Sequence, residues 1–267
     1  MSSSRDFPDV TLPPSLRAER RGEVAILRLA RPEKRNALND PTVRGVEAFF
    51  ASLPEAVRAV VLDAEGPNFS AGLDLSELSE RSTVEGVMHS MMWHRAFERV
   101  ELGRVPVVAV LKGAVVGGGL ELACAAHIRV AERTAYYALP EGQRGIFVGG
   151  GASVRVPRLI GAARMADMML TGRVYGAEEG QALGLSHYLA EPGQGLEKAL
   201  ELAGKIAANA PITNFAVVHA LPRIAEANPR EGFMLEALMA AVAQGSDEAK
   251  ERLRAFLEKR AKKVTEF

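Results

Sequence analysis

Cysteine is almost absent from this chain of 267 residues, and so are long apolar runs. The single cysteine, Cys124, excludes an internal disulfide, and together with its apolar surroundings it predicts a small buried side chain in a reducing compartment. No apolar run approaches the length of a membrane span, and residues 1–6 lack the apolar core of a signal peptide. We therefore expect a cytoplasmic protein that has no membrane partner.

Net charge is also missing, because 33 Lys and Arg residues balance 33 Asp and Glu residues. The chain has no global field that would attract a polyanion, and no basic stripe with interleaved aromatic residues, so we expect no nucleic-acid partner. Any polyanionic ligand must be bound by a few local basic side chains. The histidines lack the spacing of a metal-ligand set, so we expect no metal. They are His89, His94, His127, His187 and His219.

Apolar periodicity predicts an α/β fold followed by helices. The β-like runs Val24–Leu29, Val57–Asp63 and Val105–Val110 alternate with stretches of helical spacing, whereas the chain from Gly195 onward has helical spacing only. The polar, proline-bearing start predicts a flexible arm, with the fold beginning near Glu19. We therefore divide the chain into an arm (1–18), an α/β core (19–193) and a C-terminal helical region (194–267).

A helix is also predicted between Ser76 and Gly103. Its apolar residues Val87, Met91, Phe97 and Val100 are spaced for one buried stripe. The nearby residues Met88, Met92 and Trp93 suit either a pocket for an acyl chain or ordinary core packing, and the sequence leaves both open.

Three consecutive glycines, Gly117 to Gly119, lie between a β-like run and a stretch of helical spacing that carries Glu121. A strand, a glycine turn and a helix start leave unpaired backbone N–H groups that can hold an anion. A second carboxylate, Glu141, follows Pro140 and precedes the glycines at 149–151. Taken singly, such glycines are typical of tight turns, and each glutamate has a structural explanation, in the first turn of a helix or in a turn after proline.

A third stretch, Asn68–Leu75, ends another β-like run and changes this interpretation. Together the three stretches resemble the enoyl-CoA hydratase/isomerase family, also called the crotonase superfamily, and the resemblance extends from about Glu23 to Arg260. It implies a superhelix of ββα units, followed by a C-terminal helical region that assembles subunits into trimers or hexamers.

The resemblance also implies roles for individual residues. The backbone N–H groups of Leu73 and Gly118 would form an oxyanion hole for a thioester. Glu121 would be the base that activates water, and Glu141 would donate the α-carbon proton. No separate cofactor is implied, because coenzyme A is part of the substrate. The residues implied in substrate binding are Arg35, Ala37, Leu38, Ala71, Gly72, Asp74, Gly117, Gly149 and Lys259.

The function that these residues favour is a 2-enoyl-CoA hydratase. Other reactions of the same superfamily stay open, namely double-bond isomerisation and hydrolysis of a thioester or a carbon–carbon bond, as does non-catalytic binding of acyl-CoA or RNA. The chain departs from the family pattern at Ala126-His127, where many hydratases have Cys-Asp, and after Glu141, where a proline is missing. We therefore expect altered substrate specificity in the segment Gly142–Arg155.

Overall fold

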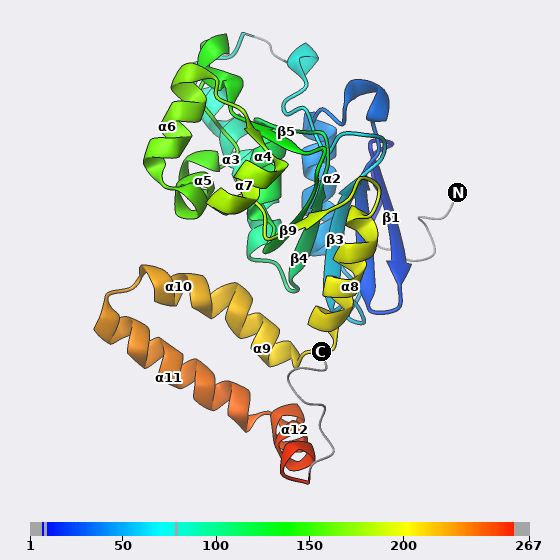
Figure 1. The fold of residues 1–267 in the computed structure, drawn as a ribbon, viewed down its shortest axis with the longest axis vertical. Coiled ribbons are helices and arrows are strands. Elements are labelled where there is room, and N and C mark those ends of the chain that lie inside the picture. The colour runs from blue at the N-terminus through cyan, green and yellow to red at the C-terminus, as the bar shows by residue number, and fades with distance from the viewer. Residues whose placement is uncertain (1–6, 8–9, 78–79, 259–267) are drawn as a thin grey trace.

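The computed structural model describes residues 7, 10–77 and 80–258, and it contains two β-sheets surrounded by helices (Figure 1). The β1–β2 pair is antiparallel, and every other neighbouring pair of the six-stranded main sheet is parallel. In spatial order its strands are β1 (Leu16–Arg21), β2 (Val24–Leu29), β3 (Ala59–Ala64), β4 (Val107–Leu111), β6 (Ile128–Glu132) and β9 (Tyr188–Ala190).

The small sheet lies beside the main sheet and positions the central glycines. Its middle strand β7 pairs in parallel with β5 and antiparallel with β8. Its strands are β5 (Ala114–Val116), β7 (Tyr136–Ala138) and β8 (Tyr175–Gly176).

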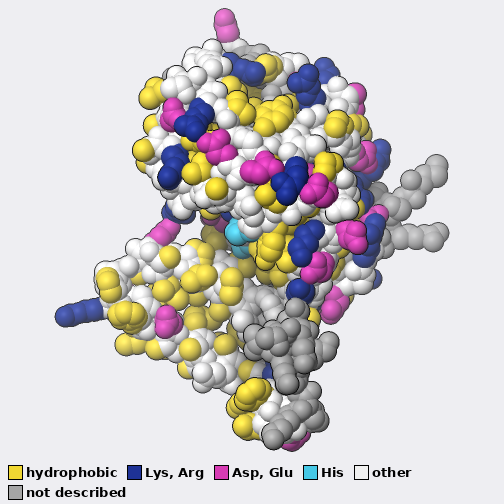
Figure 2. Space-filling model, viewed as in Figure 1, with side chains coloured by type: hydrophobic (Ala, Val, Ile, Leu, Met, Phe, Trp, Pro, Cys, Tyr) yellow, Lys and Arg dark blue, Asp and Glu magenta, His cyan; other side chains and the backbone are white. Residues whose placement is uncertain are grey.

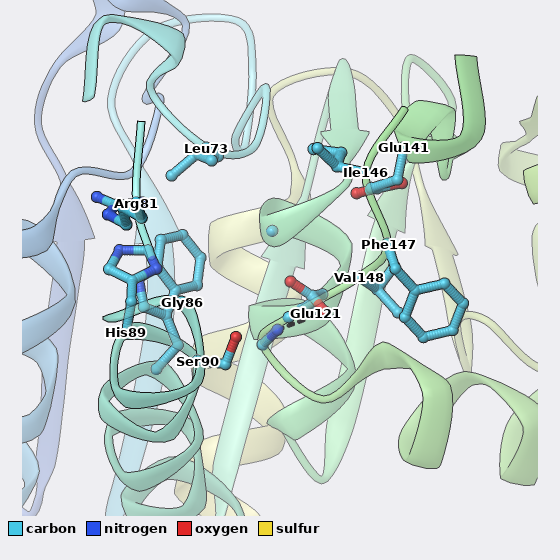
Figure 3. Close-up of a pocket in the computed structure, with 14 residues that line it drawn as sticks. Leu73, Arg81, Gly86, His89, Ser90, Glu121, Glu141, Ile146, Phe147 and Val148 are labelled. Atoms are coloured by element: carbon cyan, nitrogen blue, oxygen red, sulfur yellow. Dashed lines mark hydrogen bonds between the residues drawn. The ribbon is translucent and has the colours of Figure 1, made fainter. Parts of the chain in front are cut away.

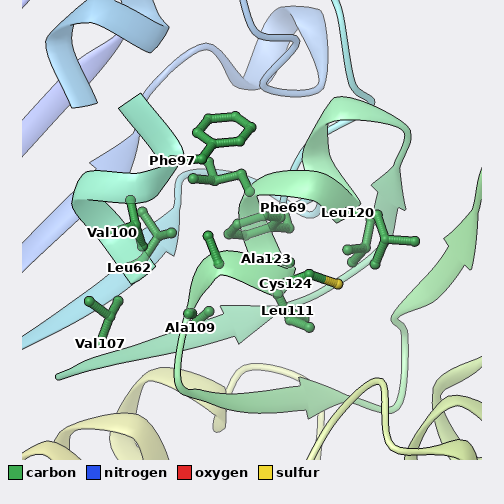
Figure 4. Close-up of a cluster of buried hydrophobic side chains, with 14 of the residues drawn as sticks. Leu62, Phe69, Phe97, Val100, Val107, Ala109, Leu111, Leu120, Ala123 and Cys124 are labelled. Atoms are coloured by element: carbon green, nitrogen blue, oxygen red, sulfur yellow. The ribbon is translucent and has the colours of Figure 1, made fainter. Parts of the chain in front are cut away.

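Both faces of the main sheet are buried, as near-continuous apolar parallel strands require. On β3, the side chains of Val60 and Leu62 enter the larger core, whereas Val61 enters a smaller core on the opposite face. The larger core includes Phe69 and Phe97 (Figure 4). The helices on its side are α2 (Asp40–Ala51), α3 (Thr83–Glu101), α4 (Gly118–Ala125), α5 (Ala152–Ile160), α6 (Ala162–Thr171) and α7 (Ala177–Leu183), with short 3-10 helices η1 (Pro32–Lys34), η2 (Leu75–Glu77) and η3 (Pro140–Arg144).

The smaller core is closed by helix α8 (Gly195–Ala207). Its residues Ala199, Leu202 and Ala203 are buried against the main sheet. Helix α8 therefore packs against the α/β core, although it lies beyond the predicted boundary at 193/194. A helix that covers a sheet has the same periodicity as a helix in a helical region, so the sequence does not distinguish the two cases.

The described strands begin before the predicted start of the fold at Glu19. Strand β1 begins at Leu16, three residues before Glu19, and Leu16 is buried. Phe7, in the predicted arm, is buried with its ring 5.1 Å from that of Phe49. Apolar residues among the prolines therefore add to the core, although the surrounding composition is polar.

Helix α3 begins later than predicted and buries only part of the predicted stripe. It starts after a capping box in which Ser82 and Glu85 bond each other's backbone N–H groups. Phe97 and Val100 are buried, whereas Val87 and Met91 are about half exposed. The N-terminal half of α3 therefore borders a surface rather than the core.

Beyond α8, the described chain is helical and projects from the α/β core (Figure 1). Figure 2 shows hydrophobic side chains gathered on this region. No described helix is long and apolar enough to cross a membrane. The α/β class and the helical C-terminal region are as predicted. The helices are α9 (Pro211–Phe215), the π-helix η4 (Ala216–Ala220), α10 (Leu221–Glu226), α11 (Pro229–Gly245) and α12 (Asp247–Leu257).

Candidate active site

The start of helix α4 exposes a backbone donor at the centre of the molecule. Gly117 has a φ of 52°, which favours glycine, and its N–H donates to the carbonyl of Ala138 on β7. Gly118 is the first residue of α4, so its N–H has no acceptor within the helix. Among the described residues this N–H donates to no protein atom.

A second free donor, the N–H of Leu73, lies beside it. Strand-like pairing of Ser70 with Val115 places the Ser70–Asp74 segment along β5. A Cβ built on Gly118 would lie 3.5 Å from the Leu73 nitrogen, so the two backbones are in close contact. The Leu73 N–H has no protein acceptor within the described part of the chain. Two fixed, unpaired donors therefore meet at one wall of a pocket.

Glu121 lies one helical turn beyond Gly118 and is almost completely buried. Its Oε1 accepts hydrogen bonds from the N–H groups of Gly150 (2.8 Å) and Ala152 (3.1 Å), the first of which is drawn in Figure 3. Burial raises the pKa of Glu121, while these backbone bonds and the charge of Arg155 oppose the rise. Glu121 therefore has donors ready to stabilise its ionised form.

Glu141 enters the same site from η3, directly after β7. A Cβ on Gly117 would lie 2.7 Å from its Oε1, so only glycine fits there without displacing the carboxyl group. Its Oε2 is buried and has no hydrogen-bond partner among the described residues. Burial raises the pKa of Glu141 to about 7, and the neighbouring charge of Glu121 also raises it. Glu141 is thus poised between its protonated and ionised forms near neutral pH.

These groups line one pocket of about 210 Å³. Figure 3 shows Glu121 and Glu141 on the α4 and η3 side, opposite the wall that α3 forms. The third side is an apolar loop that contains Ile146 and Phe147, which are exposed. The lining residues are Leu73, Arg81, Gly86, His89, Ser90, Trp93, Gly118, Glu121, Glu141, Ile146, Phe147, Val148, Gly149 and Gly150.

Of the predicted substrate-binding residues, Gly149 lines this pocket and a second group lies beside it. The segment from Arg35 to Leu38 pairs with the segment from Ala71 to Asp74. The Ala71 N–H donates to the Arg35 carbonyl, and the Leu38 N–H donates to the Gly72 carbonyl. The predicted residues Arg35, Ala37, Leu38, Ala71 and Gly72 are therefore brought together, although none of them lines the pocket itself.

Asp74 has a structural explanation that the sequence did not reveal. Its carboxylate pairs with Arg31 (2.9 Å) and accepts hydrogen bonds from Ser76, and these contacts lower the pKa of Asp74. The side chain ties the loop after Leu73 to η1 and does not line the pocket. Lys259, also predicted to bind substrate, lies outside the described residues.

Several pocket residues were missed or left open by sequence reasoning. His89 lines the pocket and pairs through Nε2 with Asp40 (2.8 Å), and Trp93 packs one turn further along α3. Of the nearby methionines, Met88 and Met91 are exposed and Met92 is buried in the core. The i, i+4 spacing of His89 and Trp93 was the available signal, but periodicity alone does not show which face of a helix borders a cavity.

Fold and site together define an α/β enzyme with two buried carboxyl groups beside a pair of free backbone donors. The model of the enoyl-CoA hydratase/isomerase family matches residues 19–266 of this chain. The chain belongs to that family, is an enzyme of this kind, and has the predicted crotonase fold.

Individual relatives agree with this assignment. The short-chain-enoyl-CoA hydratase of Clostridium acetobutylicum is 31% identical over 245 residues, which cover 91% of this chain and 94% of that protein. The crystal structure of a candidate enoyl-CoA hydratase from Rhodopseudomonas palustris has 60% identity and a TM-score of 0.91, and the match covers 94% of this chain and 98% of that one. The enoyl-CoA hydratase structure from Bacillus anthracis has 29% identity and a TM-score of 0.87, with 92% and 97% covered.

Proposed function

We propose that this protein is a 2-enoyl-CoA hydratase, which adds water across the α,β double bond of an acyl-CoA thioester. The observation that carries the proposal is the placement of two buried carboxyl groups, Glu121 and Glu141, in one pocket with the unpaired N–H groups of Leu73 and Gly118. Hydration needs a proton acceptor, a proton donor and an anion-stabilising site, and these groups supply all three.

In the proposed reaction, Glu121 accepts a proton from water while the water oxygen bonds to the β carbon. The electrons of the double bond move onto the thioester oxygen, where the N–H groups of Leu73 and Gly118 stabilise the enolate. Two such fixed donors need no reorganisation, and losing one typically costs about 3 kcal/mol of transition-state stabilisation. Glu141 then donates a proton to the α carbon, which forms the 3-hydroxyacyl thioester. The roles exchange in the dehydration direction.

The proposal also covers substrate binding, location and subunit assembly. The neighbouring segments Arg35–Leu38 and Ala71–Asp74 bind the coenzyme A part of the substrate, with Gly117 and Gly149 shaping its reactive end and Lys259 reaching the phosphates. The proposed chemistry uses no metal and no cofactor beyond coenzyme A. We also propose a cytoplasmic enzyme that assembles in a multiple of three subunits through its C-terminal helices.

The proposal is tested by mixing the purified protein with a panel of 2-enoyl-CoA thioesters of differing length and branching. We expect loss of the ultraviolet absorbance of the conjugated thioester and formation of the 3-hydroxyacyl-CoA, identified by mass. Release of free coenzyme A would indicate thioester hydrolysis, and a product of unchanged mass would indicate isomerisation. Either outcome without hydration would replace the proposed function with that alternative.

A further inference from the structure

The loop that holds Glu121 is itself held by a partly buried ion pair. The N–H groups of Gly150 and Ala152 bond to the Glu121 carboxylate, and the carbonyl of the same Gly150 accepts a hydrogen bond from Nη1 of Arg155 (3.0 Å). A single residue, Gly150, thus separates the Arg155 guanidinium from the carboxylate proposed to activate water.

Arg155 is fixed on its other side by Glu101, the last residue of α3. Nε and Nη2 of Arg155 each lie 2.7 Å from Oε2 of Glu101. The Arg155 side chain is 10% exposed and that of Glu101 is 32% exposed, so this charged contact is partly shielded from water. A chain of contacts therefore runs from α3 through α5 and the glycine loop to Glu121.

Gly151 shows how closely the guanidinium packs against this loop. Its φ is 107°, a conformation that favours glycine, and a Cβ at this position would collide with Nη1 of Arg155. Gly151 therefore leaves free the space that the Arg155 guanidinium occupies, and a side chain at position 151 would displace that guanidinium.

Titratable groups from several elements lie near Glu121. They are Glu141 on η3, Cys124 on α4, Arg155 on α5 with Glu101 behind it on α3, and Arg81 and His89, which line the same pocket. The positive charge of Arg155 lowers the pKa of Glu121 and so opposes the effect of burial. Among these groups, Arg155 stabilises the ionised carboxylate through both its charge and the loop that it orients.

We propose that Arg155 is a positioning residue of the active site, which aligns the Gly150 and Ala152 donors on Glu121 and favours the ionised form of that carboxylate. This inference rests on the proposed function only in the identity of the reaction. The position and the ionisation of Glu121 can be measured without turnover.

The test compares the Arg155→Met and Arg155→Lys variants with wild type. For Arg155→Met we expect kcat to fall on the order of 10- to 100-fold with little change in KM. A misaligned base reduces the stabilisation of the transition state more than it reduces the affinity for substrate. The acidic limb of the pH profile should move to higher pH, because Glu121 loses a stabilising positive charge. Arg155→Lys keeps the charge, so it should restore the acidic limb while recovering only part of kcat.

The neighbouring Arg158→Met variant is the matched control. Arg158 lies on the same helix but is half exposed, pairs with Glu226 and makes no hydrogen bond with the loop in the described structure, so we expect wild-type kinetics. Gly151→Ala should also move the acidic limb to higher pH, because a Cβ there displaces the same guanidinium and strains the loop at its positive φ. If Arg155→Met does not fold, Arg155→Gln provides the test.

A readout without turnover separates this inference from the proposed function. The Glu121 carboxyl signal can be titrated by NMR in protein with ¹³C-labelled glutamate and assigned by its loss in Glu121→Gln. An upward shift of this titration in Arg155→Met supports the inference even if no enoyl-CoA is hydrated. A folded Arg155→Met variant with unchanged Glu121 titration and wild-type kcat would overturn it.

Discussion

At the scale of single residues, the two glutamates of the pocket differ in what surrounds their oxygens. Glu121 receives two backbone hydrogen bonds and lies near a positive charge, whereas Glu141 has a buried oxygen without a partner in the described structure. Burial raises the pKa of both carboxyl groups, but only Glu121 has backbone donors and the charge of Arg155 opposing that rise. These contacts suit Glu121 to the role of base, and a pKa of about 7 suits Glu141 to the role of acid.

The first prediction concerns the loss of either carboxylate. Glu121→Gln and Glu141→Gln should each fold, bind acyl-CoA and lose roughly a hundredfold or more of the hydratase rate, as expected for a general acid or base. The double variant should be far less than additively worse, because both groups serve one reaction. Steady-state rates with one enoyl-CoA thioester measure this effect.

Proton exchange distinguishes the two roles. If Glu141 protonates the α carbon, Glu141→Gln should stop exchange of the α proton of a saturated acyl-CoA into deuterated water, whereas Glu121→Gln should retain some exchange. Full hydratase activity in Glu141→Gln would show that the segment Gly142–Gly151 serves other chemistry.

The second prediction concerns stability and pH. Because the pKa of Glu141 rises from 4.5 to about 7 on folding, the native state binds more protons than the unfolded state between these values. Stability therefore decreases as pH rises through this window, by up to about 3 kcal/mol for a shift of this size. Glu141→Gln removes the buried charge, so its free energy of unfolding should exceed that of wild type above pH 7.

Urea unfolding of both proteins across the pH range provides the measurement. The advantage of Glu141→Gln should disappear below about pH 4.5, where wild-type Glu141 is protonated whether the chain is folded or not. An equal advantage at all pH values would show that the charge of Glu141 is not its cause.

At the scale of elements, the site is built from the ends of strands and the start of a helix. The segment after β3 runs beside β5 and presents Leu73, and the turn after β5 presents Gly118. Both donors belong to the backbone, so their positions depend on strand pairing rather than on side-chain identity. Gly72 helps this close approach, since a Cβ on it would lie 2.8 Å from the Val116 carbonyl oxygen.

The third prediction tests the backbone donor at Leu73. Leu73→Ala keeps the N–H and should retain most of the turnover, whereas Leu73→Pro removes it and should reduce kcat by about 100- to 1000-fold. Circular dichroism checks that both variants fold. Near wild-type turnover by a folded proline variant would show that Leu73 is not an oxyanion donor.

At the scale of the whole molecule, the C-terminal helices carry large apolar side chains that are exposed in the single chain. A surface of this kind in a stable protein usually forms an interface. Over α9 to α12 the exposed apolar residues are Phe215, Val217, Leu221, Phe233, Met234, Leu235, Leu238, Val242, Leu253, Phe256 and Leu257.

The fourth prediction is that this surface assembles the protein in a multiple of three subunits, the assembly that the family resemblance implies. Light scattering at micromolar concentration should give a trimeric or hexameric mass. Phe233→Glu, at a side chain 70% exposed in the single chain, should weaken assembly. A monomeric mass for wild type would contradict the prediction, and Glu201→Gln, on the exposed face of α8, is the control that should leave assembly unchanged.

The sequence by itself indicated the long apolar strands, the glycine turns and the two glutamates near them, but not the short strands β5 and β8 or the edge strand β1. Apolar runs such as Val24–Leu29 specify strands wherever they lie, because burial on both faces of a sheet selects them. Gly117 and Glu121 are close in the chain, so one helix start presents them together whatever surrounds it. Local order along the chain was sufficient for these features.

Only the tertiary structure decided what surrounds each group. Burial and the charge of Glu121 raise the pKa of Glu141, and Arg155 reaches the Glu121 loop from a separate helix. The coverage of the sheet by α8 and the exposure of Met91 also depend on contacts between segments far apart in the chain. Periodicity shows that a helix has an apolar face, but long-range packing decides whether that face borders a sheet, a pocket or solvent.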